Sequence, residues 1–244
     1  MSRTLGIIAE YNPFHNGHLY HLKTSALKSG ADAIVCVMSG DFVQRGEPAI
    51  LDKWIRAKMA VDHGADLVIE LPFLYACNNA EWFARGAVRI LNGLGCIDVL
   101  SFGSEGGDLA VLKRTAEIIT GDSEFEAQIK AKMQEGISYP SARYEALKAV
   151  AEKQHAQVLK SPNDTLAVEY LKQMLLTNSA MQPMAIRRVH DTPEEEDSNL
   201  RPNTNSAMEP MAVRRVHDTP GAEDSNLRQN TNSARKPMAV QRLN

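Results

Sequence analysis

Two histidines near the start of the chain have the spacing of a phosphate-binding turn. His15, Asn16, Gly17 and His18 form an H-x-G-H pattern after a short apolar run that ends at Ala9. Gly17 leaves room for close approach to a ligand, and a helix starting here would point free N–H groups and its positive dipole end at an anion. Histidines three residues apart share one face of a helical turn. Their ring N–H groups could stabilise charge that develops on a triphosphate during in-line displacement at the α-phosphorus.

Three other interpretations of these histidines stay open from the residues alone. Together with His21, the pair has i, i+3, i+6 spacing, which could suggest a zinc site. No carboxylate or thiol stands at a helpful spacing, and His15 and His21 point apart on a helix, so we expect no metal held by protein side chains. For His21 alone the alternative is a capping or packing role. For His15 and His18 together the alternative is a purely structural role.

Alternating strands and helices are expected to position this turn. Buried strands are predicted at 5–9, 33–38, 67–71 and 97–102, and helices at 16–29, 51–63, 78–91, 107–120, 123–134, 138–154 and 164–176. Short apolar strands separated by helices indicate βαβ units and a parallel sheet. The predicted fold class is therefore α/β, with a Rossmann-like parallel sheet followed by further helices. Such sheets bind ligands at the carboxyl ends of their strands, where the H-x-G-H turn lies.

Composition and charge narrow the class of protein. A hydrophobic share of 43%, a charged share of 23% and a net charge of −3 are ordinary for a soluble globular protein and argue against broad, salt-driven nucleic-acid binding by the chain as a whole. Cys36, Cys77 and Cys96 lie in or beside apolar runs without CxxC spacing, which predicts buried, reduced thiols. Without a signal-peptide pattern or a run of about 20 apolar residues, we expect a cytoplasmic protein with no membrane contact.

A repeat begins near residue 177. The last 74 residues, after Tyr170, contain no Phe, Trp or Tyr, and TNSAMQPMAIRRVHDTP from Thr177 recurs as TNSAMEPMAVRRVHDTP from Thr204. A third, partial copy begins at Thr231, so the period is 27 residues. Each unit buries too little apolar surface to offset ordering costs of roughly 1–2 kcal/mol per residue. We therefore predict one domain over 1–190 and a low-complexity, largely disordered tail over 191–244.

A longer match accompanies the H-x-G-H pattern. Residues 6–22, GIIAEYNPFHNGHLYHL, strongly resemble the N-terminal signature of the tRNA(Met) cytidine acetate ligases, members of the nucleotidyltransferase superfamily. The resemblance continues through 37–48 (VMSGDFVQRGEP), 53–59 (KWIRAKM), 66–75 (DLVIELPFLY), 101–105 (SFGSE) and 161–164 (SPND). It covers roughly residues 3–190, which makes it far more specific than H-x-G-H alone.

The resemblance implies an activity, its substrates and a set of site residues. Enzymes of this family use ATP and acetate to make acetyl-adenylate, release pyrophosphate, and pass the acetyl group to the exocyclic N4 amine of the wobble cytidine in elongator tRNA(Met). His15 and His18 would be catalytic, and Mg²⁺ would bridge the ATP phosphates. The family's ATP contacts carry over to Ile8, Ala9, Glu10, Tyr11, Asn12, Pro13, Phe14, His15, Asn16, Gly17, His18, Leu19, Tyr20, His21, Gly103, Asn163, Arg188 and Val189.

Two interpretations are open for each of several neighbouring residues. Lys53, Arg56 and Lys58 near the start of a predicted helix could face phosphate or RNA, and a solvated basic face is an equal alternative. The Gly-rich stretch 103–107 is similar to a nucleotide-cradling turn, although short glycine runs are common in loops. Asp164 departs from the Asn that is more usual in the family.

The end of the chain also departs from the family. Family members are longer, with a further C-terminal region that helps engage tRNA, and we expect this chain to lack that region. If a strand over 184–189 places Arg188 at the nucleotide, the second copy offers nearly the same strand with Arg215. The first copy has the shorter tether, which favours Arg188. Two alternatives are a truncated, inactive nucleotide-binding remnant and a coenzyme-biosynthetic nucleotidyltransferase. The second would carry an ISSTxxR-type motif, whereas this chain has the SPND of 161–164.

Overall fold

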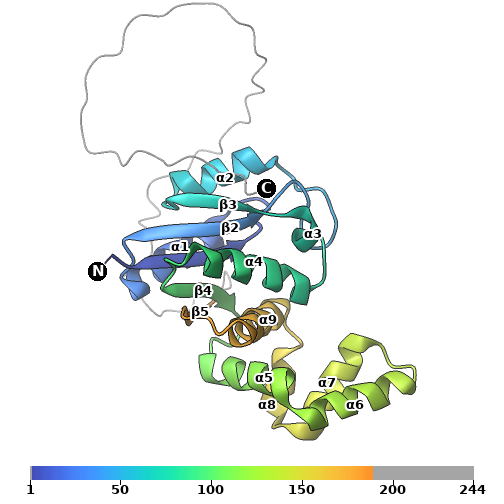
Figure 1. Ribbon diagram of the computed structural model, residues 1–244. Helices are drawn as coiled ribbons and strands as arrows, with labels where there is room; N and C mark the ends of the chain where they lie inside the picture. Colours follow the sequence, from blue (N-terminus) through green and yellow to red (C-terminus); the bar gives the residue numbers. More distant parts are fainter. Residues whose placement is uncertain (1, 189–244) are drawn as a thin grey trace, which may run out of the picture. The chain divides into compact units, whose positions relative to one another are not determined.

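Five parallel strands and nine helices build the part of the chain that the computed structural model describes, residues 2–188 (Figure 1). The strands are β1 (Thr4–Ala9), β2 (Ala33–Ser39), β3 (Leu67–Leu71), β4 (Val99–Ser104) and β5 (Gln182–Arg187). They form one sheet in the order β3-β2-β1-β4-β5, and every neighbouring pair is parallel. The predicted α/β class and Rossmann-like sheet are confirmed. The predictions for the tail, Val189 and Arg215 fall outside the described residues.

The helices follow the strands in the predicted order. They are α1 (Asn16–Ser29), α2 (Lys53–Asp62), α3 (Phe73–Ala76), α4 (Ala80–Leu94), α5 (Leu109–Gly121), α6 (Ser123–Gln134), α7 (Tyr139–Val150), α8 (Lys153–Val158) and α9 (Pro162–Leu176). The one helix expected over 138–154 is in fact two, because Ala151 is extended and ends α7. Helix α2 begins two residues later than expected, since the Asp52 carboxylate caps it by accepting from the amides of Trp54 and Ile55.

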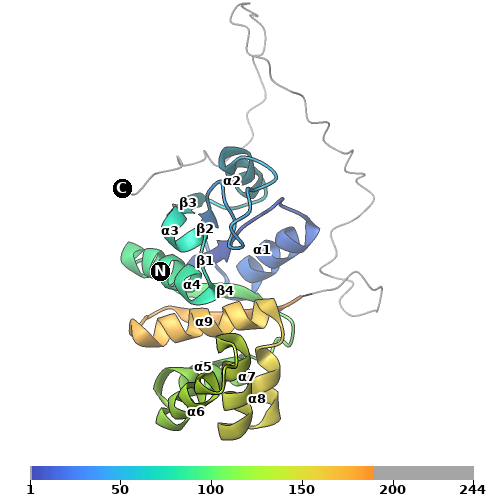
Figure 2. The same ribbon diagram turned by 90° about the vertical axis from the view of Figure 1, so that its right-hand side faces the viewer.

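Helices cover both faces of the sheet (Figures 1 and 2). Alternate strand side chains such as Ile7, Cys36 and Val68 form one apolar cluster with residues of α1 and α2. The opposite strand positions, among them Val37 and Leu100, pack with residues of α4, α5 and α9. This alternation explains the continuous apolar runs of the strands, because a parallel sheet buried on both sides needs apolar residues at every position.

The two glycines of α4 have opposite environments, and this gives a matched test of the packing. A Cβ on Gly86 would lie 2.4 Å from Cγ of Tyr75, whereas a Cβ on Gly93 would meet nothing within 4 Å. We expect Gly86→Ala to lower the free energy of unfolding by about 1–3 kcal/mol through overpacking. Gly93→Ala should raise it by up to about 1 kcal/mol, because alanine favours the helix. Urea denaturation of both variants checks this, and equal effects would contradict the packing described.

An ion pair with one fully buried member ties α9 to the helices before it. Glu169 on α9 is completely buried, and its carboxylate accepts a 2.7 Å hydrogen bond from the guanidinium of Arg143 on α7. Lys172, one turn further along α9, reaches Glu81 on α4 at 2.9 Å. These contacts hold the helix whose first turn carries Asn163.

The cysteine prediction is only partly right. All three cysteines are free, and Cys36 is buried as expected, but Cys96 is exposed because it lies in the turn that follows α4. Within residues 2–188, no helix is both long enough and apolar enough to span a bilayer.

Candidate active site

The loop between β1 and α1 is anchored from inside the protein by Tyr11. The Tyr11 side chain is 2% exposed, and its hydroxyl lies 3.6 Å from Sγ of Cys36 on β2. Its φ of 49° falls in the left-handed region, which aromatic residues rarely adopt. Burial of the ring holds this conformation, and the same burial raises the pKa of the hydroxyl. The Tyr11 side chain therefore belongs to the core and positions the loop around it.

His15 and His18 cap the first turn of α1 reciprocally. Nδ1 of His15 accepts a 3.0 Å hydrogen bond from the Gly17 amide, and Nδ1 of His18 accepts one of 3.3 Å from the His15 amide. The two rings stack with centroids 3.7 Å apart. The prediction that both histidines share one face is confirmed. The Gly17 amide is bonded within the cap, and a Cβ there would lie 2.9 Å from the His15 ring, so the packing of that ring favours glycine at this position.

The hydrogen bonds define which ring nitrogen of each histidine carries the proton. Since both Nδ1 atoms accept, the neutral rings are protonated on Nε2, as inferred from this network. Burial, followed by the charges of His15, His21 and Arg188, lowers the pKa of His18 to about 3. His18 is therefore neutral near pH 7. It can donate from Nε2–H to an anion without being a cation itself.

His21 faces the sheet rather than the exposed surface of α1. Its Nε2 lies 3.1 Å from Oγ of Ser101 on β4, which also contacts Oγ of Ser25 at 2.7 Å. Burial and then the charge of Arg188 lower the pKa of His21 to about 4. These contacts tie α1 to β4, as expected for a packing residue. Within residues 2–188, no group of three or more His, Cys, Asp or Glu side chains could hold a metal ion.

The low histidine pKa values predict acid-sensitive stability. An imidazole titrates near 6.5 in the unfolded chain, and the folded values of about 3 and 4 lie below that. The unfolded state therefore binds more protons, and stability present above about pH 6.5 is lost as pH falls toward 4 and 3. Each imidazole contributes at most about 1.4 kcal/mol per pH unit. Urea unfolding of wild type and His21→Gln measures this, and equal pH slopes would contradict it.

The loop after β4 is organised by the carboxylate of Asp164, for which the sequence predicted no role. Asp164, in the first turn of α9, is 6% exposed and accepts hydrogen bonds from Oγ of Ser104 and from the amides of Glu105, at 2.9 Å, and Gly106. The available signal was the Ser161-Pro162 helix start, which places Asp164 where it can reach a neighbouring loop. Asp164 therefore holds the Gly-rich turn of residues 103–107 in its conformation.

Arg188 and Asn163 meet at Glu105. The Asn163 side-chain amide donates to Glu105 at 2.7 Å, and the Arg188 guanidinium lies 3.6 Å from the same oxygen. Arg188 directly follows β5, which pairs with β4, and its stem lies 3.6 Å from where a Cβ of Gly103 would be. A Cβ at Gly103 would therefore be in ordinary van der Waals contact with the arginine stem, which packs beside β4. The first repeat copy supplies this strand, over Gln182–Arg187 rather than the expected 184–189.

These segments converge where the strand order reverses. Strand β1 lies between β2 and β4, so the His15–His18 turn and the Gly103 loop flank the switch point that binds ligands in such sheets. The charge of Arg188 acts on both His18 and His21, although the arginine is about 170 positions later in the chain. Of the remaining predicted residues, Ile8 is buried, Ala9, Glu10, Asn12, Phe14, Leu19, Tyr20 and Asn163 are half-buried, and Pro13 and Asn16 are exposed.

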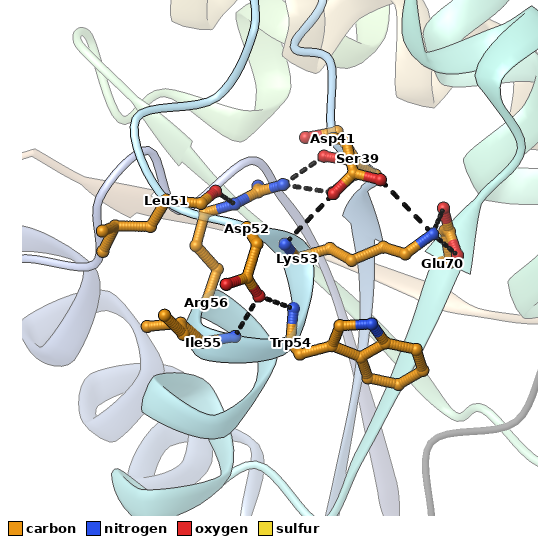
Figure 3. Close-up of polar contacts among 10 residues, drawn as sticks. Ser39, Asp41, Leu51, Asp52, Lys53, Trp54, Ile55, Arg56 and Glu70 are labelled. Atoms are coloured by element: carbon orange, nitrogen blue, oxygen red, sulfur yellow. Dashed lines mark hydrogen bonds and ion pairs between the residues drawn. The ribbon is translucent and has the colours of Figure 1, made fainter. Parts of the chain in front are cut away.

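The prediction for Arg56 was wrong. Both interpretations placed it at a phosphate, at RNA or in solvent, but Arg56 is completely buried. Its guanidinium donates to the carbonyl oxygens of Leu51 (3.0 Å), Ser39 (3.2 Å), Glu10 and Gly40, as Figure 3 shows in part. It thus joins the carboxyl ends of β1 and β2.

The two lysines of the same helix are each ion-paired. Nζ of Lys53 lies 2.7 Å from the Glu70 carboxylate at the end of β3 and 3.6 Å from Asp41 (Figure 3). Lys58 pairs with Asp62 on the exposed face of α2, which agrees with the solvated alternative for that residue.

A parallel sheet with an H-x-G-H turn after its central strand is the arrangement of an α/β nucleotidyltransferase. The chain belongs to the HIGH nucleotidyl transferase family, whose family model matches residues 2–239. Its curated relatives include the tRNA(Met) cytidine acetate ligase of Acetivibrio thermocellus, 50% identical over an alignment of 194 residues that covers 78% of this chain and 46% of that protein. The ligase of Caldicellulosiruptor saccharolyticus is 53% identical over 188 residues, 77% of this chain and 46% of that protein.

A solved structure shares the fold. Thermotoga maritima TmcAL bound with alpha-thio ATP superposes with a TM-score of 0.74 and 39% identity, over 77% of this chain and 47% of that one. This chain therefore spans about half the length of the relatives it matches.

Proposed function

We propose that this chain binds ATP at the carboxyl ends of β1, β4 and β5 and activates acetate as acetyl-adenylate. In this proposal an acetate oxygen attacks the α-phosphorus, the bond from that phosphorus to the bridging oxygen breaks, and pyrophosphate leaves. Nε2–H groups of His15 and His18 donate to the phosphate oxygens as negative charge shifts during displacement. Arg188 supplies the positive charge on the opposite side of the switch point.

The second step is acetyl transfer to RNA. The N4 amine of the wobble cytidine in elongator tRNA(Met) attacks the acetyl carbonyl carbon, the bond to the adenylate oxygen breaks, and AMP leaves. The amine loses one proton as the amide forms. We propose that this reaction takes place in the cytoplasm.

One observation carries the proposal more than any other. Arg188, Gly103 and the two imidazoles His18 and His21 gather at one switch point although they come from the end of β5, from β4 and from α1. This matches the ligand position of open α/β sheets. The names of the relatives and the ATP analogue bound to the Thermotoga protein support the assignment of substrate and nucleotide.

The proposal includes Mg²⁺ only as a companion of the nucleotide. Because the described residues offer no cluster of metal-binding side chains, the fitting arrangement is a cation that arrives on the phosphate oxygens. When bound there, it would neutralise charge on the triphosphate.

Acetate-dependent exchange of pyrophosphate into ATP tests the first step. We expect exchange with acetate and none when the acid is omitted. A folded sample that binds ATP but shows no exchange would contradict the proposal.

Transfer of radiolabelled acetyl groups to elongator tRNA(Met) tests the second step, with a tRNA carrying uridine at the wobble position as the control. Exchange without transfer would identify the chain as an adenylate-forming remnant. Truncation after Val189 then shows whether the tail contributes, since unchanged ATP affinity without transfer would favour the remnant.

A further inference from the structure

Three large aromatic side chains are exposed on the segments that follow β2 and β3, namely the loop after β2, the first turn of α2 and the start of α3. Phe42 is 40% exposed, Trp54 50% and Phe73 63%, and we refer to these three residues as the aromatic rim. Single exposed apolar residues are normal, but a group of aromatic rings on adjoining segments indicates a binding surface. Ile50 and Leu74, which are 71% and 66% exposed, extend the apolar character of the same segments.

The fold holds these segments together. Phe42 lies in the loop after β2, where it forms a bridge with Pro48, and its ring meets the ring of Phe73 edge-on with centroids 5.5 Å apart. Trp54 lies in the first turn of α2, and Lys53 beside it spans to Glu70 at the end of β3 (Figure 3). Phe73 begins α3, three residues after Glu70.

The loop carrying Phe42 is bonded to the candidate active site. The Gln44 amide donates to the Glu10 carboxylate at 2.6 Å, and the Ile50 amide donates to the Asn12 side-chain oxygen at 2.7 Å. Glu10 and Asn12 belong to the turn that leads to His15. The aromatic rim therefore adjoins the β2 side of the switch point, whereas Gly103 and Arg188 lie on the β4 side.

The charge around the aromatic rim suits a base better than a phosphate backbone. Carboxylates of Asp41, Glu47, Asp52 and Glu70 outnumber the cations of Arg45 and Lys53 along these segments. Lys53 is already paired with Glu70 and Asp41. A surface that gripped phosphates would need an excess of basic residues. Stacking uses the uncharged face of a base, so an aromatic ring does not itself need basic neighbours, and in this arrangement basic residues outside the aromatic rim would contact the RNA backbone.

We propose that the aromatic rim stacks an unpaired nucleobase of the RNA acceptor and so brings its exocyclic amine to the acetyl-adenylate. This inference rests on the proposed function, because only an RNA acceptor calls for such a surface. An unpaired loop base can leave its neighbours and lie against an aromatic ring, which suits an anticodon-loop cytidine.

Trp54 gives a direct optical test. The chain has two tryptophans, so Trp82→Phe leaves Trp54 as the single indole. Titration of the full-length Trp82→Phe protein with an anticodon stem-loop RNA containing an unpaired wobble cytidine should quench Trp54 fluorescence by stacking. The same hairpin with an abasic wobble site should quench it less. Equal quenching by both RNAs, or binding without quenching, would overturn the inference.

Affinity measurements test the other two rings. Phe73→Leu and Phe42→Leu keep an apolar side chain but remove stacking, and each should weaken binding of the hairpin by roughly 5- to 100-fold. The slope of log affinity against log salt should stay unchanged, because no phosphate contact is lost. Tyr139→Leu is the matched control, since Tyr139 is an exposed aromatic residue, 45% exposed, on α7.

The outcomes separate this inference from the proposed function. The wild-type protein could catalyse acetate-dependent exchange while the Phe42→Leu and Phe73→Leu variants bind RNA as tightly as wild type. That result would contradict this inference but not the proposed function. Failure of the wild-type chain to bind the hairpin also defeats it. Variants that alter self-association in sedimentation but not RNA affinity would assign the aromatic rim to a protein partner and overturn the RNA assignment. Absence of exchange in wild type would count against the proposed function. Quenching of Trp54 fluorescence would still show whether the aromatic rim stacks a base.

Discussion

Replacement of His18 by alanine should lower the rate of acetate-dependent pyrophosphate exchange by about 10²- to 10³-fold. That is the usual loss when one preorganised donor to developing negative charge is removed. The effect is large because the neutral imidazole, whose pKa is about 3, offers an oriented Nε2–H at the start of α1. The measurement is the exchange rate at saturating ATP and acetate, alongside nucleotide affinity.

His15 allows the chemical and structural roles to be separated. Its Nδ1 caps α1 by accepting from the Gly17 amide, and serine is also a good N-cap residue. His15→Ser should therefore keep stability close to wild type, whereas His15→Ala should lose about 1 kcal/mol. Both should lose exchange activity to a similar extent. Lys23→Ala, an exposed change on the same helix, serves as the control.

A different pattern would contradict the assigned role. If His15→Ser retained wild-type exchange while His15→Ala lost it, the imidazole would be acting only as a cap. If the double variant His15→Ala with His18→Ala kept nucleotide affinity and adenylate formation, the proposed site would be wrong.

The second large effect concerns folding and should come from Arg56. Arg56→Met should lower the free energy of unfolding by about 3–5 kcal/mol, since buried carbonyl oxygens that lose a donor cost about 1–3 kcal/mol each. The guanidinium serves four carbonyls, those of Leu51, Glu10, Ser39 and Gly40. Methionine fills a similar volume but donates to none of them. Urea denaturation measures the change.

Two further variants make the Arg56 test specific. Arg56→Lys keeps the positive charge but cannot serve several carbonyls in a plane, so it should recover only part of the loss. Lys58→Ala removes an exposed ion pair with Asp62 on the same helix and should change stability by less than about 1 kcal/mol. If Arg56→Lys had the stability of wild type, the positive charge, rather than the several N–H donors of the guanidinium, would be what stabilises the junction of β1 and β2.

The sequence by itself determined most of the local structure and predicted the location of the candidate site. Short apolar runs, helix caps and the H-x-G-H turn act over a few residues, so each could be interpreted without the fold. The parallel sheet followed from strands alternating with helices, and the site followed from the position of His15 and His18 after a strand. The break at Ala151 and the four-residue α3 were missed because their apolar patterns are too short to distinguish from neighbouring segments.

Only the tertiary structure decided the roles of residues whose hydrogen-bond partners are distant in the sequence. Arg56 looks like an exposed basic residue in its helix, and it is buried because its acceptors come from Ser39 and from Glu10, 17 and 46 positions away. Asp164 likewise found its amide partners on another loop, 58 and 59 positions away. The partners in both cases are backbone groups, carbonyl oxygens for Arg56 and amides for Asp164, and such groups are present all along the chain. Their availability depends on how strands are ordered in space, and no local pattern encodes that order.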